Sequence, residues 1–596
     1  MPTFLSNWLI VLAILCGLGL AGSFATFCFE DCFKFRALTA PMFGVLFLSL
    51  GTMTVYVVLR VPVKTAGLVT LLGLWSISAI TIYLARGRRR LRLSITALIL
   101  TLAVSAILTA VETASSIKFG EPSLLILDGA DHLNYSQVVD WLLAHRVTQA
   151  PQVGPDLPYE SIVNLLYAVD PRFGAYGFLA TLCELTKQSA AFTFDLACAA
   201  AMSVGILAVS AAFARSKKSL ILLCSGLLTC HWFDYSRAGF LAKILSYPAI
   251  FFMAGLFLAA CRLRWSPLRI AILIVATEAT ALLQSGMTEG LFLGLFGGAF
   301  LLLGPAFKDA DLPAGKHLHA CWVMLGLFVV VAILASGTVA RPLALAYPSW
   351  GYPWHIIYPR LAELENMWVD VTRLTGPWLE AFLIGSLLLW LCLGALAVYS
   401  RSATGTAFVL APMLLLVVLR AANATDTTFQ MIGIFYPAAL LGSIVTLDLQ
   451  PEKTRTREES RLLNIVVVSW ILLAIGLHLP RTIGAINRFC INVPVQFQVV
   501  HSQIKKLRQL VRKQSVSVDV GDTPQLSKIV LTELADDCEL QFSARDWKNI
   551  FWYRKWPVPQ YSSPASFRLL VKGAAVPEGY VPVYSTNQCL LLKSFQ

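Results

Sequence analysis

The chain has 596 residues, of which 57% are hydrophobic and only 14% are charged. Soluble globular proteins carry roughly 25% charged residues, so this composition excludes a large soluble enzyme and a disordered chain. The formal net charge of +13 does not indicate nucleic-acid binding, because Lys and Arg mark the cytoplasmic loops of membrane proteins. The apolar residues form runs too long for a water-soluble core. The sequence therefore predicts a polytopic, α-helical membrane protein.

The apolar runs predict about 14 transmembrane helices of roughly 20 residues each, with the sixth, eighth, ninth and twelfth shorter than a bilayer demands. In chain order, the runs are Trp8–Phe27, Leu38–Leu59, Ala66–Ala85, Leu93–Val111, Phe192–Ala212, Leu220–Phe233, Ile244–Ala260, Ile270–Leu283, Leu291–Leu303, Cys321–Ala335, Trp378–Tyr399, Ala407–Leu419, Phe429–Val445 and Leu463–Leu479. The first run lacks a basic flank before Trp8 and is interpreted as a retained helix rather than a cleaved signal peptide.

Basic residues predict the orientation of these helices. They concentrate in the loops that follow odd-numbered runs, such as the arginine-rich segment 86–92. Such loops stay in the cytoplasm. The N-terminus, the long loops 112–191 and 336–377, and the C-terminal tail are then predicted to lie outside.

The tail changes character from about residue 483 and predicts a small extracytoplasmic α/β domain, residues 483–596. Its predicted helices are Val495–Lys513, with a basic face, and a second helix from Pro524 to about Leu534. Its predicted strands are Val516–Val520, Glu539–Phe542, Phe567–Val571, Val581–Tyr584 and Cys589–Lys593, the last two forming a hairpin. Cys538 and Cys589 could form a disulfide in an oxidising compartment.

The first long outer loop carries an acidic motif, Asp128 and Asp131, followed by His132. Two carboxylates three residues apart can share one helical face. They could take a proton from a hydroxyl nucleophile or hold a divalent cation. The alternative is that one of them caps a helix that starts near His132. His132 could ligate a metal, but no second histidine lies nearby in the sequence.

This loop resembles the corresponding loop of the GT-C superfamily, polytopic glycosyltransferases that use polyprenyl-phosphate-linked sugars. The resemblance rests on the acidic motif, on Tyr135 with a helix near Tyr135–His145, on the segment Asp170–Gly177, and on an extracytoplasmic C-terminal domain. It covers the chain from Leu93 onward, with a GT-C-like core over residues 93–482. Residues 1–92 would then supply additional N-terminal helices.

The resemblance implies that Asp128 or Asp131 is the catalytic base or a metal-holding carboxylate. It also implies a lipid phosphate leaving group, which needs positive charge to stabilise it. Basic side chains could supply this charge at the outer surface, although each could instead be an interfacial residue that snorkels. The candidates are Arg237, Lys243, Arg341, Arg360 and Arg420.

Two further groups of residues are candidates for substrate binding. Trp350, Trp354 and His355 belong to the second long outer loop, where aromatic faces could stack on sugar rings or form a headgroup-level belt. Glu278 lies within an apolar run, where a carboxylate is costly, and Gln284 follows at the outer turn. The alternative for Glu278 is a buried structural hydrogen bond.

Together these features predict a glycosyltransferase of the bacterial plasma membrane. It would transfer a sugar from a polyprenyl-phosphate carrier to a hydroxyl of a cell-envelope glycan or glycolipid on the outer face, with a divalent cation as the one candidate cofactor. The alternatives are a polysaccharide polymerase or ligase, which would depend on loop arginines and a catalytic His or Glu, and a transporter or flippase of lipid-linked glycans. A transporter predicts two related halves, which the sequence lacks.

Overall fold

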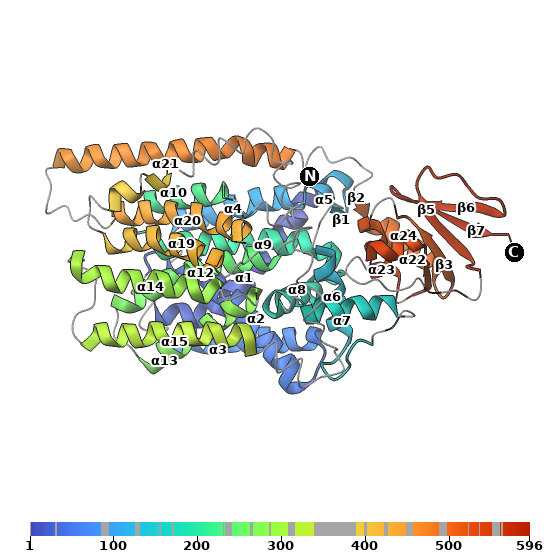
Figure 1. Cartoon of the computed structure of the whole chain (residues 1–596), viewed down its shortest axis with the longest axis horizontal. Coiled ribbons are helices and arrows are strands. Elements are labelled where there is room, and N and C mark those ends of the chain that lie inside the picture. Colours follow the sequence, from blue (N-terminus) through green and yellow to red (C-terminus); the bar gives the residue numbers. More distant parts are fainter. Residues whose placement is uncertain are drawn as a thin grey trace.

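A computed structural model gives the protein as a long helical bundle with a small α/β region at one end (Figure 1). We refer to that end as the domain end of the bundle. The structure describes residues 2–29, 33–84, 94–125, 132–152, 154, 157–169, 172–230, 232, 241–262, 266–284, 288–307, 316–338, 389–391, 393–397, 402–421, 427–448, 457–487, 498–521, 524–535, 537–550, 559, 561 and 564–595.

The bundle contains apolar helices that coincide with thirteen of the fourteen predicted runs, while most of the run Trp378–Tyr399 lies outside the described residues. They are α1 (Pro2–Cys28), α2 (Ala40–Leu59), α3 (Val63–Leu84), α4 (Ile95–Glu112), α9 (Ala190–Phe213), α10 (Lys217–Leu228), α12 (Leu241–Arg262), α13 (Pro267–Gln284), α14 (Thr288–Phe307), α15 (Lys316–Thr338), α19 (Ala403–Ala421), α20 (Thr427–Asp448) and α21 (Arg457–Ile486). A short 3-10 turn, η1 (Arg36–Leu38), precedes α2. Within the described ranges, six helices are long and apolar enough to cross a membrane: α1 to α4, α9 and α12. Helix α10, which covers the first part of the predicted run 220–233, is shorter than these six helices.

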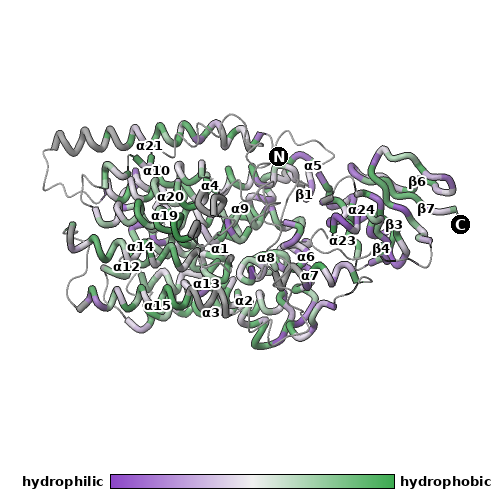
Figure 2. Tube along the Cα trace, viewed as in Figure 1, coloured by the Kyte–Doolittle hydropathy of each residue, from purple (hydrophilic) through white to green (hydrophobic). Residues whose placement is uncertain are grey.

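The bundle is apolar outside as well as inside, the pattern expected of a helical membrane protein. Ile80 of α3 is 59% exposed and Val323 of α15 is 71% exposed, while the interior is filled by residues such as Phe251 and Phe257. Figure 2 shows hydrophobic residues along the whole length of the bundle. A helix that is hydrophobic all round suits lipid, where the α-helix satisfies its own backbone groups.

Helices α1 and α2 pack with their backbones almost in contact. A Cβ atom at Gly22 would overlap the carbonyl oxygen of Ala40, and one at Gly44 would overlap the carbonyl oxygen of Leu18. Small residues at helix interfaces permit this close approach in membranes. Glycine at these two positions therefore allows α1 and α2 to pack closely against each other.

The N-terminal helices are integral to the bundle. Helix α2 packs against α13 and against α8 (Phe173–Thr186), and Gly67 of α3 lies against the Thr181 side chain of α8. Residues 1–92 thus help to position α8, which begins at the site described below.

Short elements connect the bundle to the C-terminal region at the domain end. These are α5 (Ala114–Phe119), β1 (Ser123–Leu125), α6 (His132–Ala144), α7 (Pro158–Val169) and α8. The predicted helix near Tyr135–His145 is confirmed as α6, which starts three residues earlier. Helix α5 ends at Gly120, whose φ of +76° is accessible mainly to glycine and turns the chain toward β1.

The C-terminal domain combines a five-stranded sheet with three helices. Its elements are β2 (Gln498–Val500), α22 (His501–Val511), β3 (Ser515–Asp519), α23 (Pro524–Leu534), β4 (Glu539–Phe542), α24 (Ala544–Ile550), β5 (Phe567–Val571), β6 (Tyr580–Ser585) and β7 (Cys589–Ser594). The sheet order is β4-β3-β5-β7-β6, with β3 parallel to β4 and β5, and β7 antiparallel to β5 and β6. Strand β2 lies outside this sheet and pairs with β1.

The predicted elements of the tail are largely confirmed, with two corrections. Strands Glu539–Phe542 and Phe567–Val571 have the predicted bounds, and β6 and β7 form the predicted hairpin. The predicted helix Val495–Lys513 is wrong at its beginning, because residues 498–500 form β2 through pairing with the distant β1. The disulfide prediction is also wrong: both thiols are free, and burial raises their pKa to about 12.

A buried carboxylate joins the strands and helices of the domain. Asp546 of α24 accepts hydrogen bonds from the Ser527 hydroxyl (2.5 Å), the Ser543 hydroxyl (2.5 Å) and the Val520 amide (3.1 Å). Burial raises its pKa, and the three donors partly offset that effect. The carboxylate thereby ties α23, α24 and the end of β3 together.

We predict that Gly22→Val destabilises the bundle by about 1–3 kcal/mol, because the added side chain must separate α1 from α2. The measurement is the thermal unfolding midpoint of the detergent-purified protein. Gly73→Val is the matched control, since no atom lies within 4 Å of a Cβ placed at Gly73. Equal midpoints for the two variants would contradict the proposed close packing.

Candidate functional site

The acidic motif is bracketed by two described elements at the domain end. Strand β1 ends at Leu125, and α6 begins at His132. Asp128 and Asp131 lie outside the described residues, so their roles as base, cation ligand or helix cap remain predictions. The structure therefore defines the surroundings of the motif through β1 and α6.

Tyr135 is the centre of a buried cluster on α6. Its side chain is 1% exposed, and its hydroxyl accepts hydrogen bonds from the Arg172 guanidinium and from the backbone amide of Ala242 (3.2 Å). The Arg172 guanidinium carbon also lies 4.9 Å from the centre of the tyrosine ring, a cation–π geometry. The predicted residue Tyr135 thus joins α6 to the residue before α8 and to the first turn of α12.

Two basic residues belong to the elements that contact this tyrosine. Arg172 is the half-buried N-cap residue of α8. Lys243 follows Ala242 in the first turn of α12 and is only 5% exposed. The N-terminus of a helix adds partial positive charge from its amide groups. The Tyr135 hydroxyl thus contacts a guanidinium and the first turn of a helix that carries Lys243. Guanidinium groups and helix N-termini are the groups that proteins use to bind anions.

Aromatic rings complete the cluster on α6. The Tyr135 ring lies 5.7 Å from the Tyr176 ring in an edge-on arrangement and 6.0 Å from the Phe194 ring. The His132 ring lies 5.7 Å from the same Phe194 ring and is 5% exposed. His132 and Tyr135 therefore share one face of α6, which packs on α9. This packing makes His132 a part of the core as well as a neighbour of the motif.

Arg172 is the functional candidate that sequence reasoning did not select as a phosphate ligand. It was part of the predicted segment Asp170–Gly177 but was not selected as a separate candidate. Gly174 allows α8 to begin close to α13, because a Cβ atom at Gly174 would lie only 3.1 Å from the Cα of Leu283 on α13. The close contact between α8 and α13 sets the position of Arg172 at the start of α8.

The other predicted residues are not brought into this cluster by the described contacts. Glu278 lies within α13 and is half-buried. Gln284 ends α13 and Arg420 lies in the last turn of α19, but the structure does not describe either side chain. The remaining candidates lie outside the described residues: Arg237, Arg341, Trp350, Trp354, His355 and Arg360.

Metal binding has no support from the described part of the chain. Within it, no group of three His, Cys, Asp or Glu side chains could hold a metal ion. The His132 ring packs against Phe194 rather than beside another described ligand. A divalent cation would therefore depend on Asp128 and Asp131 and remains a prediction.

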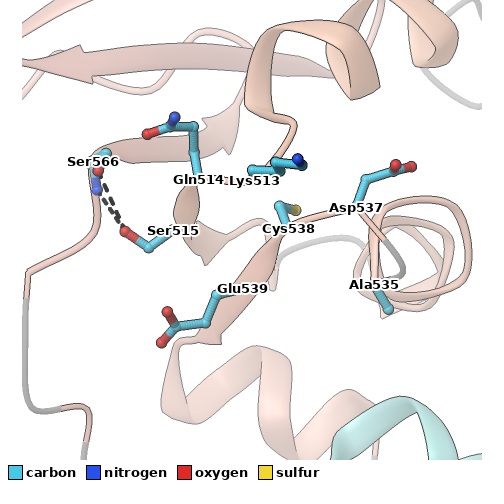
Figure 3. Close-up of a pocket in the computed structure, with 8 residues that line it drawn as sticks. All are labelled: Lys513, Gln514, Ser515, Ala535, Asp537, Cys538, Glu539 and Ser566. Atoms are coloured by element: carbon cyan, nitrogen blue, oxygen red, sulfur yellow. Dashed lines mark hydrogen bonds between the residues drawn. The ribbon is translucent and has the colours of Figure 1, made fainter.

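The C-terminal domain contains an open, polar depression of about 520 Å³ (Figure 3). It lies where β3, β4 and β5 begin and is lined by Lys513, Gln514, Ser515, Ala535, Asp537, Cys538, Glu539 and Ser566. Ligands of open α/β sheets usually bind at the carboxyl ends of the parallel strands, which is the opposite edge. We therefore place the candidate site at Tyr135, within the bundle, rather than in this depression.

No protein-family model matches the chain, and comparison with curated proteins finds no similar sequence. The functional assignment consequently depends on the residues of the cluster and on the sequence motif beside it.

We predict that Tyr135→Phe lowers the stability of the cluster by about 1–3 kcal/mol, because the half-buried Arg172 guanidinium and the buried Ala242 amide lose a shared acceptor. Hydrogen exchange should accelerate at the start of α12. The measurement is amide exchange by mass spectrometry, with Tyr83→Phe as the control because Tyr83 is 68% exposed. Unchanged exchange at residues 241–246 would contradict the role assigned to the hydroxyl.

Proposed function

We propose that the protein is an integral-membrane glycosyltransferase of the GT-C type, with about 14 transmembrane helices. It would transfer a sugar from a polyprenyl-phosphate carrier to a hydroxyl of a cell-envelope glycan or glycolipid on the outer face of a bacterial plasma membrane. The observation that supports the proposal is the contact of the Tyr135 hydroxyl with Arg172 and with the Ala242 amide, which precedes the buried Lys243. Tyr135 lies on α6, the helix that follows the acidic motif.

The proposed reaction is a substitution at the anomeric carbon. Asp128 or Asp131 accepts the proton of the acceptor hydroxyl, whose oxygen forms the new glycosidic bond. The bond between the anomeric carbon and the phosphate oxygen breaks, and the lipid phosphate leaves with the electron pair. The region around Arg172 and Lys243 supports this assignment, because fixed positive charge stabilises a phosphate leaving group.

Arginine is well suited to the phosphate role. Its planar guanidinium can bind phosphate through two parallel hydrogen bonds, whereas lysine acts as a point charge. The contact with the Tyr135 hydroxyl and ring orients the guanidinium before substrate arrives. Such prior orientation reduces the cost of arranging charge during the reaction.

The first test compares membranes from a deletion strain and an overexpressing strain. Polyprenyl-phosphate sugars and surface glycans are extracted and measured by mass spectrometry. A lipid-linked monosaccharide that accumulates on deletion, with a matching sugar missing from one glycan, would support the transferase. Accumulation of a whole lipid-linked oligosaccharide would instead support the polymerase, ligase or flippase alternatives.

We predict that Asp128→Asn and Asp131→Asn together abolish transfer, because an amide cannot accept the acceptor proton. The measurement is complementation of the deletion strain at equal membrane abundance. Glu578→Gln is the control, since Glu578 is exposed in the C-terminal domain. Full complementation by the double variant would exclude the acidic motif as the catalytic base.

We predict that Arg172→Lys lowers kcat/KM for the lipid-linked donor by roughly ten- to a hundred-fold, the effect of losing a hydrogen bond to a charged group. The assay measures transfer from the donor identified in the deletion strain. Arg146→Lys is the matched control, because Arg146 is exposed and follows the same α6 helix. Equal loss in both variants would argue against a specific role for Arg172.

A further inference from the structure

The C-terminal domain is joined to the segment before the acidic motif by a two-stranded antiparallel ribbon. Strand β1 pairs with β2, with Ser123 opposite Val500 and Leu125 opposite Gln498. The His501 amide extends the ribbon by donating to the Pro122 carbonyl (3.0 Å). Among the described strands, β2 is the only partner of β1. The position of β1 therefore depends on residues from the far end of the chain.

A carboxylate beside this ribbon caps the first helix of the C-terminal domain. Glu121 accepts hydrogen bonds from the Ser502 amide (3.1 Å) and from the Ser502 hydroxyl (2.8 Å). The N-cap residue of α22 is Val500, whose side chain accepts no capping hydrogen bond. Glu121 thus supplies an acceptor that the local sequence lacks, at the helix end where negative charge is stabilising.

The ribbon is also fixed from inside the protein. Gln498 is fully buried, and its side-chain oxygen lies 3.5 Å from the Ser115 hydroxyl of α5. Its backbone carbonyl accepts a hydrogen bond from the Gln588 side chain, in the turn between β6 and β7. Both α5 and the main sheet of the domain are therefore connected through one residue of β2.

A second contact joins the domain to the element that follows the motif. Helix α23 packs on α6 and α7. Glu533 of α23, which is 6% exposed, accepts a hydrogen bond from the Ser189 hydroxyl (3.0 Å). Asp140 of α6 accepts one from the Ala190 amide (3.0 Å). Helix α23 and helix α6 therefore both bind the start of α9.

We infer that the C-terminal domain is a positioning element of the proposed active site, and that Glu121 and Ser502 are positioning residues for it. The domain holds β1 before the acidic motif and α6 after it. Helix α6 carries His132 and Tyr135, so the orientation of the Tyr135–Arg172 cluster depends on the same docking. This inference rests on the proposed function for its catalytic consequence, but the docking itself can be measured separately.

Titration of His501 should make this docking dependent on pH. The His501 ring lies 4.6 Å from the Phe192 ring of α9, at the junction between the domain and the bundle. Burial and the Lys505 charge lower the pKa of His501 below 6.5; Glu121 opposes this effect and Arg508 adds to it. The docked state therefore binds fewer protons than the undocked state. Docking is therefore strongest above the pKa of His501 in the undocked state. It weakens as the pH falls through the lower pKa of His501 in the docked state.

The test compares Glu121→Ala and Ser502→Ala with Ser502→Thr, which keeps a hydroxyl, and with Glu578→Gln as an unrelated surface control. Hydrogen exchange of the full-length protein is measured at β1, α6 and the first turn of α22. Loss of a helix cap should accelerate exchange there by roughly three- to ten-fold in the two alanine variants. Ser502→Thr should restore slow exchange.

A second arm measures sugar transfer by the same variants. A positioning role predicts a lower kcat with an unchanged donor KM, whereas a purely structural role would lower only the amount of folded protein. Wild-type exchange at β1 should also increase from about pH 7.5 to about pH 5.5, after correction for intrinsic rates, and His501→Phe should remove this increase.

The outcomes separate the inference from the proposed function. Unchanged exchange at β1 and α6 in the alanine variants would overturn the inference. Faster exchange without any change in kcat would also overturn it. The proposed function would be refuted if the wild-type protein transferred no sugar and the Asp128 and Asp131 variants complemented the deletion. The exchange measurements would then still decide whether the domain positions β1 and α6.

Discussion

The lipid environment determines where this protein can place polar chemistry. Inside the bundle, several hydroxyl groups donate back to the backbone of their own helices, as Thr277 does to Leu273 (2.8 Å) and Ser203 to Ala199 (2.7 Å). Such local hydrogen bonds satisfy a side chain where water is absent. Chemistry that requires several convergent polar groups is therefore favoured at an end of the bundle, and the Tyr135 cluster lies at the domain end.

The cluster is difficult to explain as a device for stability. Buried cations lose hydration that ion pairing rarely repays, and an apolar core of the same volume is often as stable. Lys243 is nevertheless 5% exposed, and Arg172 is held against Tyr135 by both its hydroxyl and its ring. Three separate elements converge to maintain this arrangement. Stability alone does not require basic residues at the starts of α8 and α12.

Features that depend on neighbouring residues could be predicted from the sequence, and features that depend on distant ones could not. The apolar runs correctly predicted α1 to α4, because the hydropathy of a helix can be read from one continuous segment of the sequence. Strand β2 was predicted as helix, since its partner β1 lies hundreds of residues earlier and leaves no mark on the local pattern. Arg172 was missed for the same reason, because its contacts with Tyr135 arise only when α6 and α8 pack.

The dependence on distant residues also sets the order in which the site can be completed. Helices α6, α8 and α12 are synthesised early, so the contacts of Tyr135 with Arg172 and Ala242 can form while the bundle assembles. The backbone groups of β1 gain their strand partner only when β2 arrives, after the last helix of the bundle. Unpaired backbone groups are costly away from water. The C-terminal domain thus supplies the strand partner of β1 only after the helices of the bundle have been synthesised.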